Sequence, residues 1–414
     1  MYNILKKSLN KIIIIYTIAV ILRIITVLLF ADKNYIFFEP YVIGKNLADG
    51  LGYTFGWYGK VPLQPTALFP PIYTLFIASI LSISKNPDTI FIVQSFLNAA
   101  CVFPAYILGS YIKDKNTGLI SSLLVAAFPQ MVFVPAKLVS ENFFIPLFGV
   151  TIYSYISIRE KIFGHNMRLI FYGILVGLLT LTKSIGILLL ITAILDIFLK
   201  GNKIKYSIKH SLFILIAFLS IMTPWMIRNT IELGYPIMTR TGLGFNLWRG
   251  NHQGASGTGR VSPWLTIEKA MSYEYKNYIQ QNLPENELEI DNFYKNEALR
   301  FIRKNPIKFT WLSLKRLIYF LTIDPTHYLT RNVIYIASYI FLMIFGISGI
   351  ISMVKKKRWN AYFTMTIVSF IVVYSVVMVL PRYRLPLTWL LLCFSSIPLS
   401  RYLLKVKVIK TLIT

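Results

Sequence analysis

The sequence predicts an all-α membrane protein, in which a polytopic bundle of transmembrane helices carries loops outside the cytoplasm. Of the 414 residues, 55% are hydrophobic and 14% are charged, whereas roughly a quarter of residues carry charge in soluble domains. Apolar runs long enough to cross ~30 Å of hydrocarbon recur along the chain, and short basic clusters separate them. These observations exclude a soluble fold.

The basic clusters also predict the orientation in the membrane. Six segments together hold 19 Lys and Arg residues against two acids: 1–11, 112–116, 159–168, 200–210, 354–359 and 403–414. By the positive-inside rule, we expect them in the cytoplasm. Two long polar segments, 31–67 and 228–305, hold 13 Lys and Arg residues against 11 acids, so we expect them outside. The clustering also argues against nucleic acid as a partner, although the formal charge is +26.

An N-terminal transmembrane module is expected over residues 1–227. Its first helix, 11–30, leads into a first external loop, 31–67, within which 39–49 can form a short helix. Two apolar runs, 68–84 and 89–111, lie between this loop and the cytoplasmic cluster 112–116. Only an odd number of crossings can join an external loop to a cytoplasmic cluster, so one of the two runs, taken as 68–84, should be a partial or re-entrant helix. The other crossings of this module are expected at 89–111, 117–134, 141–158, 169–183, 184–199 and 211–227.

Two further regions complete the chain. An extracytoplasmic loop domain, 228–305, opens with a glycine-rich stretch and continues with polar sequence typical of helices. The C-terminal region, 306–414, begins with the run 306–323, in which Lys308 and Lys315 lie among aromatic and aliphatic residues. That pattern is typical of a helix lying in the membrane interface. Three more crossings are expected at 333–353, 360–380 and 386–404. The total is about ten or eleven crossings.

Acidic residues near the outer membrane face are scarce, so each is weighed as a catalytic group or a solvated charge. Glu39 follows two phenylalanines and precedes Pro40, an apolar setting that favours a working general base. Asp32 is the other candidate in the same loop. Glu141 begins a transmembrane helix at its outer end, where the helix dipole favours a carboxylate, so capping alone also explains it.

Cations on the outer face oppose the positive-inside bias and therefore indicate an anionic partner. Lys183 interrupts an apolar stretch at its outer turn, and Arg382 and Arg384 lie between the last two helices. Arginine binds phosphate through two parallel hydrogen bonds, so a lipid phosphate is a natural partner. Snorkelling of these side chains to lipid headgroups is the alternative.

A third group of candidates surrounds the outer end of the last helix of the module. Arg228 and Asn229 lie at that end, and the glycine-rich stretch 242–259 carries Asn246 and Asn251. These side chains supply hydrogen-bond donors for phosphate and sugar hydroxyls. The sequence shows no metal-ligand cluster, phosphate-binding loop or Ser-His arrangement, since its four histidines are scattered and both cysteines lie inside apolar runs.

At these residues the sequence resembles the GT-C superfamily of membrane glycosyltransferases, in the branch related to dolichyl-phosphate-mannose protein mannosyltransferases and the bacterial aminoarabinose transferase. The resemblance extends over most of the chain. Its pieces are the acid before Tyr41 and the segments 46–53, 70–73, 140–141, 181–183, 224–229, 245–251 and 382–386. Each piece alone is weakly specific, whereas their order along the chain is fairly specific.

The resemblance implies a GT-C helical bundle, a polyprenyl-phosphate sugar donor, inverting transfer of a hexose or pentose, and a catalytic acid in the first external loop. The family usually has an aspartate or an Asp-Glu pair a few residues before the tyrosine, whereas here Glu39 stands two residues before Tyr41. The base is therefore either Glu39 or Asp32. No cofactor is required by the pattern, although a divalent ion near Glu141 is compatible with it.

The expected function is that of a multi-pass glycosyltransferase of the cell membrane, with its active site on the extracytoplasmic face. Its partners would be the polyprenyl-phosphate sugar, membrane lipids and an acceptor protein, lipid or glycan. Glu39 would deprotonate the acceptor hydroxyl while Lys183, Arg228, Arg382 and Arg384 stabilise the departing phosphate. Two alternatives stay open: a lipid or solute transporter, and a non-catalytic subunit of a glycan assembly complex.

Overall fold

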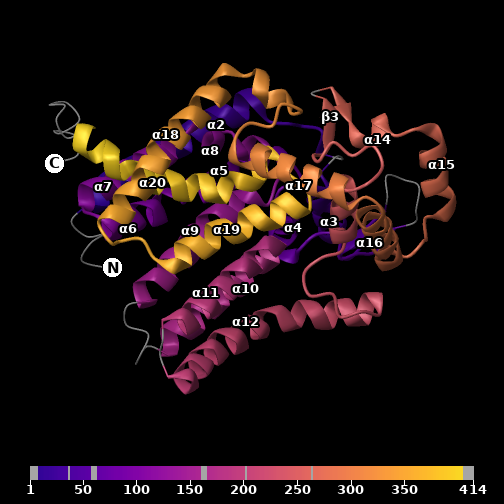
Figure 1. Cartoon of the computed structure of the whole chain (residues 1–414), viewed down its shortest axis with the longest axis horizontal. Helices are drawn as coiled ribbons and strands as arrows, with labels where there is room; N and C mark the ends of the chain where they lie inside the picture. The colour runs from indigo at the N-terminus through magenta and orange to yellow at the C-terminus, as the bar shows by residue number, and fades with distance from the viewer. Residues whose placement is uncertain are drawn as a thin grey trace.

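The computed structural model describes residues 8–35, 38–56, 63–159, 166–200, 203–262 and 264–403. The basic clusters 1–11, 159–168, 200–210 and 403–414 lie partly outside these residues. Helices make up most of the described chain, and its strands form two short antiparallel pairs (Figure 1).

The N-terminal part of the fold consists of helices α2 to α12. They are α2 (Leu9–Phe30), α3 (Glu39–Ala48), α4 (Pro71–Ile83), α5 (Asp88–Ala99), α6 (Val102–Ile112), α7 (Lys115–Ala127), α8 (Pro129–Val132), η2 (Val134–Ala136), α9 (Glu141–Arg159), α10 (Asn166–Thr182), η3 (Ser184–Gly186), α11 (Ile187–Leu199) and α12 (Ile204–Leu233). Strands β1 (Thr54–Phe55) and β2 (Gln64–Pro65) pair within the first loop. Most of these helices match the predicted runs closely, and α3 is the short helix expected in the first loop.

The remainder of the chain begins with short elements and ends with long helices. They are α13 (Leu243–Gly250), β3 (Arg260–Ser262), β4 (Leu265–Thr266), α14 (Ile267–Ala270), α15 (Tyr273–Asn282), α16 (Glu287–Lys304), α17 (Pro306–Leu321), η4 (Tyr328–Arg331), α18 (Val333–Lys355), α19 (Ala361–Val376), η5 (Pro381–Arg384) and α20 (Leu385–Leu403). The glycine-rich stretch expected as a loop contains α13, which is preceded by Gly242 in a left-handed conformation with a φ of 80°.

One predicted crossing is not a single straight helix. The run 117–134 divides into α7 and the α8–η2 segment, and the two are bent by 60°. Pro129 explains the break, because a proline disfavours helical backbone in the preceding residue. Phe128 accordingly has an extended conformation, with φ −66° and ψ 123°.

Several helices are long and apolar enough to cross a membrane, so the chain is a multi-pass membrane protein. Within the described residues, four meet this description: α2, the nearly continuous α5–α6 segment, α12 and α18. The bent α7–η2 segment would be a fifth. The expected total of ten or eleven crossings also counts shorter helices, such as α4, α10 and α19, that do not reach across ~30 Å alone.

Glycines allow the helix pairs of the bundle to approach closely. A Cβ atom on Gly173 of α10 would meet the carbonyl oxygen of Ile214 in α12, and one on Gly349 of α18 would meet the carbonyl oxygen of Phe394 in α20. Small residues serve this purpose in membrane bundles, where helices gain stability from close van der Waals contact. Apolar side chains remain exposed on the outward faces, including Ile14, Leu28, Ile216 and Ile344.

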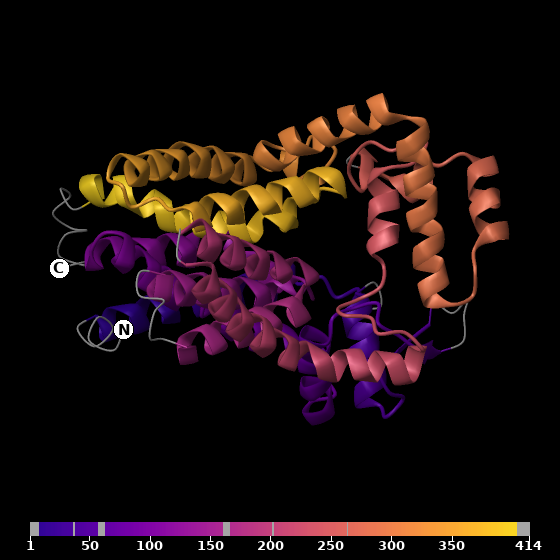
Figure 2. The ribbon, with the colours of Figure 1, turned by 60° about the horizontal axis from the view of Figure 1, so that its bottom comes forward.

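The two ends of the bundle differ in what they carry. The ammonium of Lys113 donates to the hydroxyl of Ser400 at 2.6 Å, and Arg358 donates to the carbonyl oxygen of Ile112. The basic turns 112–116 and 354–359 therefore meet near the end of α20. Helices α13, α15 and α16 lie beyond the opposite end (Figure 2).

The two polar segments expected outside the membrane lie against each other. Glu287, at the start of α16, accepts hydrogen bonds from the hydroxyls of Thr66 and Thr241 and, at 3.0 Å, from the backbone N–H of Ala67. One carboxylate thus joins the first loop to the segment that leads into α13.

Helix α17 forms over the run expected in the membrane interface. Leu312, Arg316 and Phe320 are buried on one face, and α17 packs against α19. The other face exposes Ile307 and Trp311. The helix is therefore amphipathic, and its position in the interface stays a prediction.

Candidate active site at the helix ends

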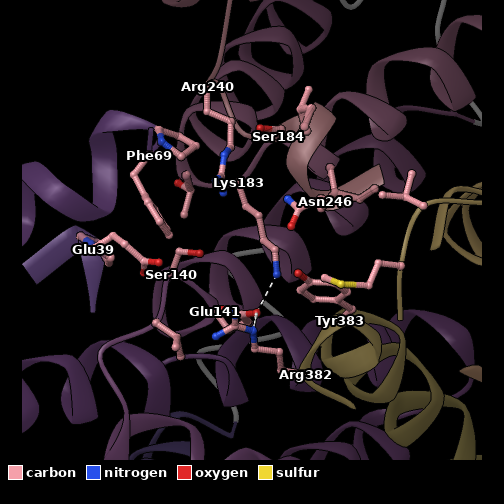
Figure 3. A pocket seen from close by; sticks show the side chains of 18 of the residues that line it. Glu39, Phe69, Ser140, Glu141, Lys183, Ser184, Arg240, Asn246, Arg382 and Tyr383 are labelled. Carbon is pink, nitrogen blue, oxygen red and sulfur yellow. Dashed lines mark hydrogen bonds and ion pairs between the residues drawn. The ribbon is translucent and has the colours of Figure 1, made fainter. Parts of the chain in front are cut away.

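A cavity of about 180 Å³ opens where several helices begin or end (Figure 3). Its walls come from the start of α3, the segment before α4, the start of α9, the turn after α10, the first half of α13 and the region between α19 and α20. Its polar and aromatic lining residues include Glu39, Phe69, Ser140, Glu141, Lys183, Ser184, Arg240, Asn246, Tyr374, Arg382 and Tyr383. Of the residues proposed from sequence, the structure brings Glu39, Glu141, Lys183, Asn246 and Arg382 together here.

Glu141 forms the centre of an ionic cluster on one wall. Its carboxylate lies 2.6 Å from the ammonium of Lys183 and 3.8 Å from Nε of Arg382, and the residue is only 2% exposed. Figure 3 shows Lys183 and Arg382 converging on this carboxylate. Glu141 therefore holds both cations at the cavity, in addition to any effect as a helix cap.

Local structure explains why these charges lie here. Helix α10 ends at Thr182, Lys183 has an extended backbone with φ −158°, and η3 follows. Lys183 thus stands at the C-terminal end of a helix, whereas Glu141 stands at the N-terminal end of α9. The helix dipoles favour a cation at the first position and an anion at the second.

Glu39 lies on the opposite wall. It is the first residue of α3 and is followed by Pro40, which suits the start of a helix because it lacks an N–H. Its side chain points from α3 toward the cavity and Ser140 (Figure 3). Within the described part of the chain, no hydrogen bond or ion pair engages its carboxylate, in contrast to that of Glu141.

Arg240 and Tyr383 line the cavity but were not among the candidates from sequence. The guanidinium of Arg240 lies 4.7 Å from the ring centroid of Phe69, and its Nε donates to the carbonyl oxygen of Thr241 at 2.8 Å. Burial lowers the pKa of Arg240, while Tyr383 and Glu39 oppose that effect, and an arginine keeps its charge. The ammonium of Lys183 lies 4.8 Å from the ring centroid of Tyr383. Arg240 could have been found by the argument applied to Arg382, because it is also a cation in a segment predicted to be external.

The charge balance of the cavity favours an anion. Three cations, Lys183, Arg240 and Arg382, face two carboxylates, Glu39 and Glu141. The amide of Asn246 adds a neutral hydrogen-bonding group from α13. A carboxylate that forms no hydrogen bond or ion pair with the described residues thus borders the same space as a group of cations.

Asp32, Arg228 and Asn229 lie outside the described lining of this cavity. Asp32 accepts hydrogen bonds from the backbone and side chain of Asn34, at 3.3 and 3.1 Å. Arg228 donates to the carbonyl oxygens of Thr66 and Tyr53, at 2.7 and 3.0 Å, and so holds the first loop. Asn229 donates to the carbonyl oxygen of Ile237 at 2.8 Å, within the turn that follows α12.

Asn251 and Arg384 are also engaged elsewhere. Asn251 donates to the carbonyl oxygen of Val376 at 3.1 Å and accepts from Arg316 at 3.0 Å. Arg384 is 4% exposed and donates to the carbonyl oxygen of Thr322 and the hydroxyl of Tyr335. Both side chains therefore join segments of the wall rather than face the cavity.

The described residues include no group of three His, Cys, Asp or Glu side chains that could hold a metal ion. Glu141 is already paired with two cations. A divalent ion in the cavity would therefore depend on Glu39 and on oxygens of a substrate, an arrangement that magnesium accepts.

Comparison with known proteins finds a family model that matches part of the sequence and solved structures that share the fold. The sequence profile of the family described as dolichyl-phosphate-mannose-protein mannosyltransferase matches residues 69–227, which is less than half of the chain. That segment includes Glu141 and Lys183 but neither Glu39 nor Arg382. The comparison with curated protein sequences gave no significant match.

Solved structures share the fold over nearly the whole chain. The archaeal oligosaccharyltransferase AglB from Archaeoglobus fulgidus, in complex with an inhibitory peptide and a dolichol-phosphate, is 14% identical with a TM-score of 0.58, covering 99% of this chain and 52% of that one. The apo form of the oligosaccharyltransferase from that organism is 15% identical with a TM-score of 0.57, covering 98% and 51%. The chain thus spans about half the length of these structures. ArnT from Cupriavidus metallidurans bound to undecaprenyl phosphate gives 9% identity and a TM-score of 0.47, covering 93% and 77%, and no conclusion rests on it.

Proposed function

Because this chain has the membrane fold of the GT-C glycosyltransferase superfamily, we propose that it transfers a sugar from a polyprenyl-phosphate carrier to an acceptor outside the cytoplasm. The observation that carries the proposal is the cavity in which Glu39, free of ionic partners among the described residues, faces the cations Lys183, Arg240 and Arg382. On one side of a bound sugar, a carboxylate can take the proton of the acceptor hydroxyl. On the other side, cations can stabilise the departing phosphate.

In the proposed reaction, Glu39 takes the proton from an acceptor hydroxyl. The acceptor oxygen forms a bond to the anomeric carbon of the sugar, the bond from that carbon to the phosphate oxygen breaks, and the polyprenyl phosphate leaves with the electron pair. Attack opposite the leaving group inverts the anomeric centre. Lys183, Arg240 and Arg382 stabilise the negative charge that develops on the phosphate.

Glu141 acts in this proposal by positioning. Its contacts with Lys183 and Arg382 keep both cations at the cavity before a donor arrives, so less reorganisation is needed when the phosphate leaves. Arg228, Asn229, Asn251 and Arg384 then serve to hold the walls, and Asn246 is placed to contact the sugar.

The arrangement of the bundle supports an active site outside the cytoplasm. The basic turns 112–116 and 354–359 lie at one end, and α13 and the cavity residues lie at the other (Figure 2). The positive-inside rule assigns the basic end to the cytoplasm. The cavity would then open toward the outer leaflet, where the carrier phosphate and an external acceptor can both reach it.

Sugar transfer by the purified full-length protein tests the proposal. The protein, reconstituted in lipid, is incubated with a panel of polyprenyl phosphates that each carry a radiolabelled sugar, with and without acceptor extract, and the products are separated by thin-layer chromatography. We expect donor-dependent transfer or release of label that Glu39→Gln suppresses. If no carrier is cleaved and the label instead crosses the membrane of sealed vesicles, the protein is a transporter. If no carrier is cleaved or moved and the protein copurifies with a glycosyltransferase, it is an assembly subunit.

A further inference from the structure

A second pocket, of about 460 Å³, lies in the region between α13 and α16 and is separate from the cavity described above. Its lining residues come from the turn after α13, the end of α14 and the first half of α15: His252, Gln253, Gly254, Ala270, Met271, Ser272, Glu274, Tyr275 and Tyr278. None of these residues belongs to the proposed reaction.

Near-parallel aromatic rings line this pocket. The rings of His252 and Tyr275 lie 7° from parallel with centroids 6.1 Å apart, and those of Tyr275 and Tyr278 lie 11° from parallel at the same separation. Trp248 contacts two of these residues: its ring stacks on that of His252 with centroids 4.6 Å apart, and its Nε1 donates to the hydroxyl of Tyr275 at 3.0 Å. Aromatic faces attract the positive edges of C–H groups, and a pyranose ring presents such groups on its flat side.

His252 lines the pocket, and the contact of its Nδ1 fixes its tautomer. Its Nδ1 lies 3.0 Å from the carbonyl oxygen of Trp248, and since a carbonyl can only accept, Nδ1 carries the proton. In the neutral ring, Nε2 is then an acceptor. Burial lowers the pKa of His252, so the ring is neutral at pH 7. Gln253, Ser272 and Glu274 supply further polar groups that match hydroxyls.

Charge distinguishes the two pockets. The cavity at the helix ends contains three cations, whereas none of the described residues that line the second pocket is Lys or Arg. A phosphate would therefore find no counter-charge in the second pocket. A neutral ligand rich in hydroxyls fits its lining better.

We propose that the second pocket binds a neutral sugar unit of a glycan, stacked on Tyr275 and hydrogen-bonded to His252. This inference rests on the proposed function, because α13 links the two sites. Asn246 on α13 lines the first cavity, and His252, six residues later, lines the second. From Asn246 to the end of α13 at Gly250, the helix rises by about 6 Å at 1.5 Å per residue, and His252 lies two residues beyond that end. One glycan could occupy both, with the reacting end in the first cavity and a further sugar unit in the second.

Direct binding of free oligosaccharides tests the inference without any turnover. Saturation-transfer NMR on the full-length protein, with a panel of neutral oligosaccharides of glucose, galactose, mannose and N-acetylglucosamine, should show binding by the wild-type protein. Ala270→Trp should reduce affinity at least about tenfold, because Ala270 lines the pocket and is exposed, so an indole there fills the space while the aromatic rings stay intact. Tyr275→Ala should have a similar effect.

The matched control is Tyr273→Ala, which removes the same side chain from the same helix, 78% exposed and outside the described lining. It should leave affinity unchanged. Glycan binding that persists in both pocket variants, or a wild-type protein that binds none of the panel, overturns the inference. In the transfer assay, Ala270→Trp should raise the KM for the acceptor if the glycan belongs to the acceptor, and the KM for the donor if it belongs to the carrier. Wild-type protein that binds glycans without cleaving any carrier contradicts the proposed function alone.

Discussion

Arg382 and Arg384 are separated by one residue, yet their guanidinium groups have different surroundings. Arg382 lines the cavity, 3.8 Å from the carboxylate of Glu141, with 48% of its side chain exposed. Arg384 is buried between the carbonyl oxygen of Thr322 and the hydroxyl of Tyr335. The first is placed for a ligand, and the second joins η5 to the segments around it.

This pair gives a test with its own control. Arg382→Gln should weaken binding of a polyprenyl phosphate roughly tenfold or more, because it removes a charge-assisted contact, and should leave thermal stability nearly unchanged. Arg384→Gln should instead lower stability by about 2 kcal/mol, because it removes a buried charged donor from the hydroxyl of Tyr335 and the carbonyl oxygen of Thr322. Binding is measured by titration with the lipid and stability by a thermal unfolding assay. Equal effects of both substitutions on lipid binding would contradict the division of roles.

Glu39 and Asp32 are the two candidate bases left open by the sequence. Glu39→Gln keeps the shape of the side chain but removes the base, so turnover should fall by roughly 10² to 10⁴ with little change in donor binding. Asp32→Asn should have a small effect, because Asp32 contacts Asn34 and lies outside the described lining of the cavity. The comparison is made by single-turnover transfer with labelled donor. A reversed result would identify Asp32 as the base.

The sequence could identify charged residues near the outer face, but not the direction in which each side chain points. Lys183 was recognisable because it interrupts an apolar stretch, and Glu141 because it begins a helix. Arg228 and Arg384 were recognisable as cations near predicted outer helix ends, yet they bind the backbone carbonyls of Tyr53 and Thr322, which are far away in the chain. Such contacts follow from the packing of loops, and no local pattern in the sequence encodes them.

At the scale of elements, the turn after α13 is fixed by its contact with the end of α19. A Cβ atom on Gly250 would meet the carbonyl oxygen of Val377, and Asn251 donates to the carbonyl oxygen of Val376 at 3.1 Å. Arg316 of α17 completes the junction by donating to the carbonyl oxygen of Gly250 at 2.7 Å. The position of α13, and with it that of Asn246, depends on this close approach.

Gly250→Ala should therefore lower stability by about 1–3 kcal/mol, because the added methyl group has no space. It should also reduce transfer activity, since α13 would shift at the cavity. Gly259→Ala is the matched control: the nearest atoms to its Cβ would lie at 3.4 Å, an ordinary contact. Thermal unfolding and transfer assays on both variants measure the difference, and a stable, fully active Gly250→Ala protein would show that the junction does not position α13.

The loop between α17 and α18 contains a histidine whose protonation should affect stability. Nδ1 of His327 accepts a hydrogen bond from the backbone N–H of Leu329 at 3.2 Å and so caps η4. Burial, aided by Arg260 and Lys137, lowers the pKa of His327 to about 4. In the unfolded chain, the pKa of a histidine is about 6.5. Between about pH 6.5 and about pH 4, His327 therefore binds a proton more readily in the unfolded state than in the folded state, so the stability of the fold should decrease as the pH is lowered through this range.

His327→Asn supplies the control for this prediction. Asparagine also caps a helix start but does not titrate. We expect the thermal midpoint of the wild-type protein to fall more than that of the variant between pH 7 and pH 5, as measured in one buffer series at constant ionic strength. Identical pH profiles for the two proteins would exclude His327 as the source of any loss.

Helix positions were the most predictable elements, because an apolar run must be helical in lipid to satisfy its backbone hydrogen bonds. The run 117–134 failed as a single helix where Pro129 interrupts it. Short elements such as α13 and the β1–β2 pair were harder to predict, since their stability comes from tertiary contacts such as those of Glu287 with Thr66 and Thr241.

For the whole molecule, the orientation in the membrane can be tested with introduced cysteines. Glu285 lies in the segment predicted to be external and Lys356 in a basic turn, and both are exposed. The native cysteines, Cys101 and Cys393, are buried and should give little background. In intact cells, Glu285→Cys should react with a membrane-impermeant thiol reagent, whereas Lys356→Cys should react only after permeabilisation. The opposite labelling pattern would place the cavity in the cytoplasm and remove the proposed function with it.

The short helices around the cavity have a consequence for the surrounding bilayer. Helices α10, α11 and α19 contain 17, 13 and 16 residues, or about 26, 20 and 24 Å at 1.5 Å per residue, against a hydrocarbon thickness of ~30 Å. Local thinning of the bilayer is one response to such a hydrophobic mismatch. A lipid phosphate could then reach Lys183 without leaving its leaflet, because the headgroup plane itself is lowered at that point. Thick bilayers resist such compression, so under the proposed function the rate of sugar transfer should fall as the bilayer is made thicker.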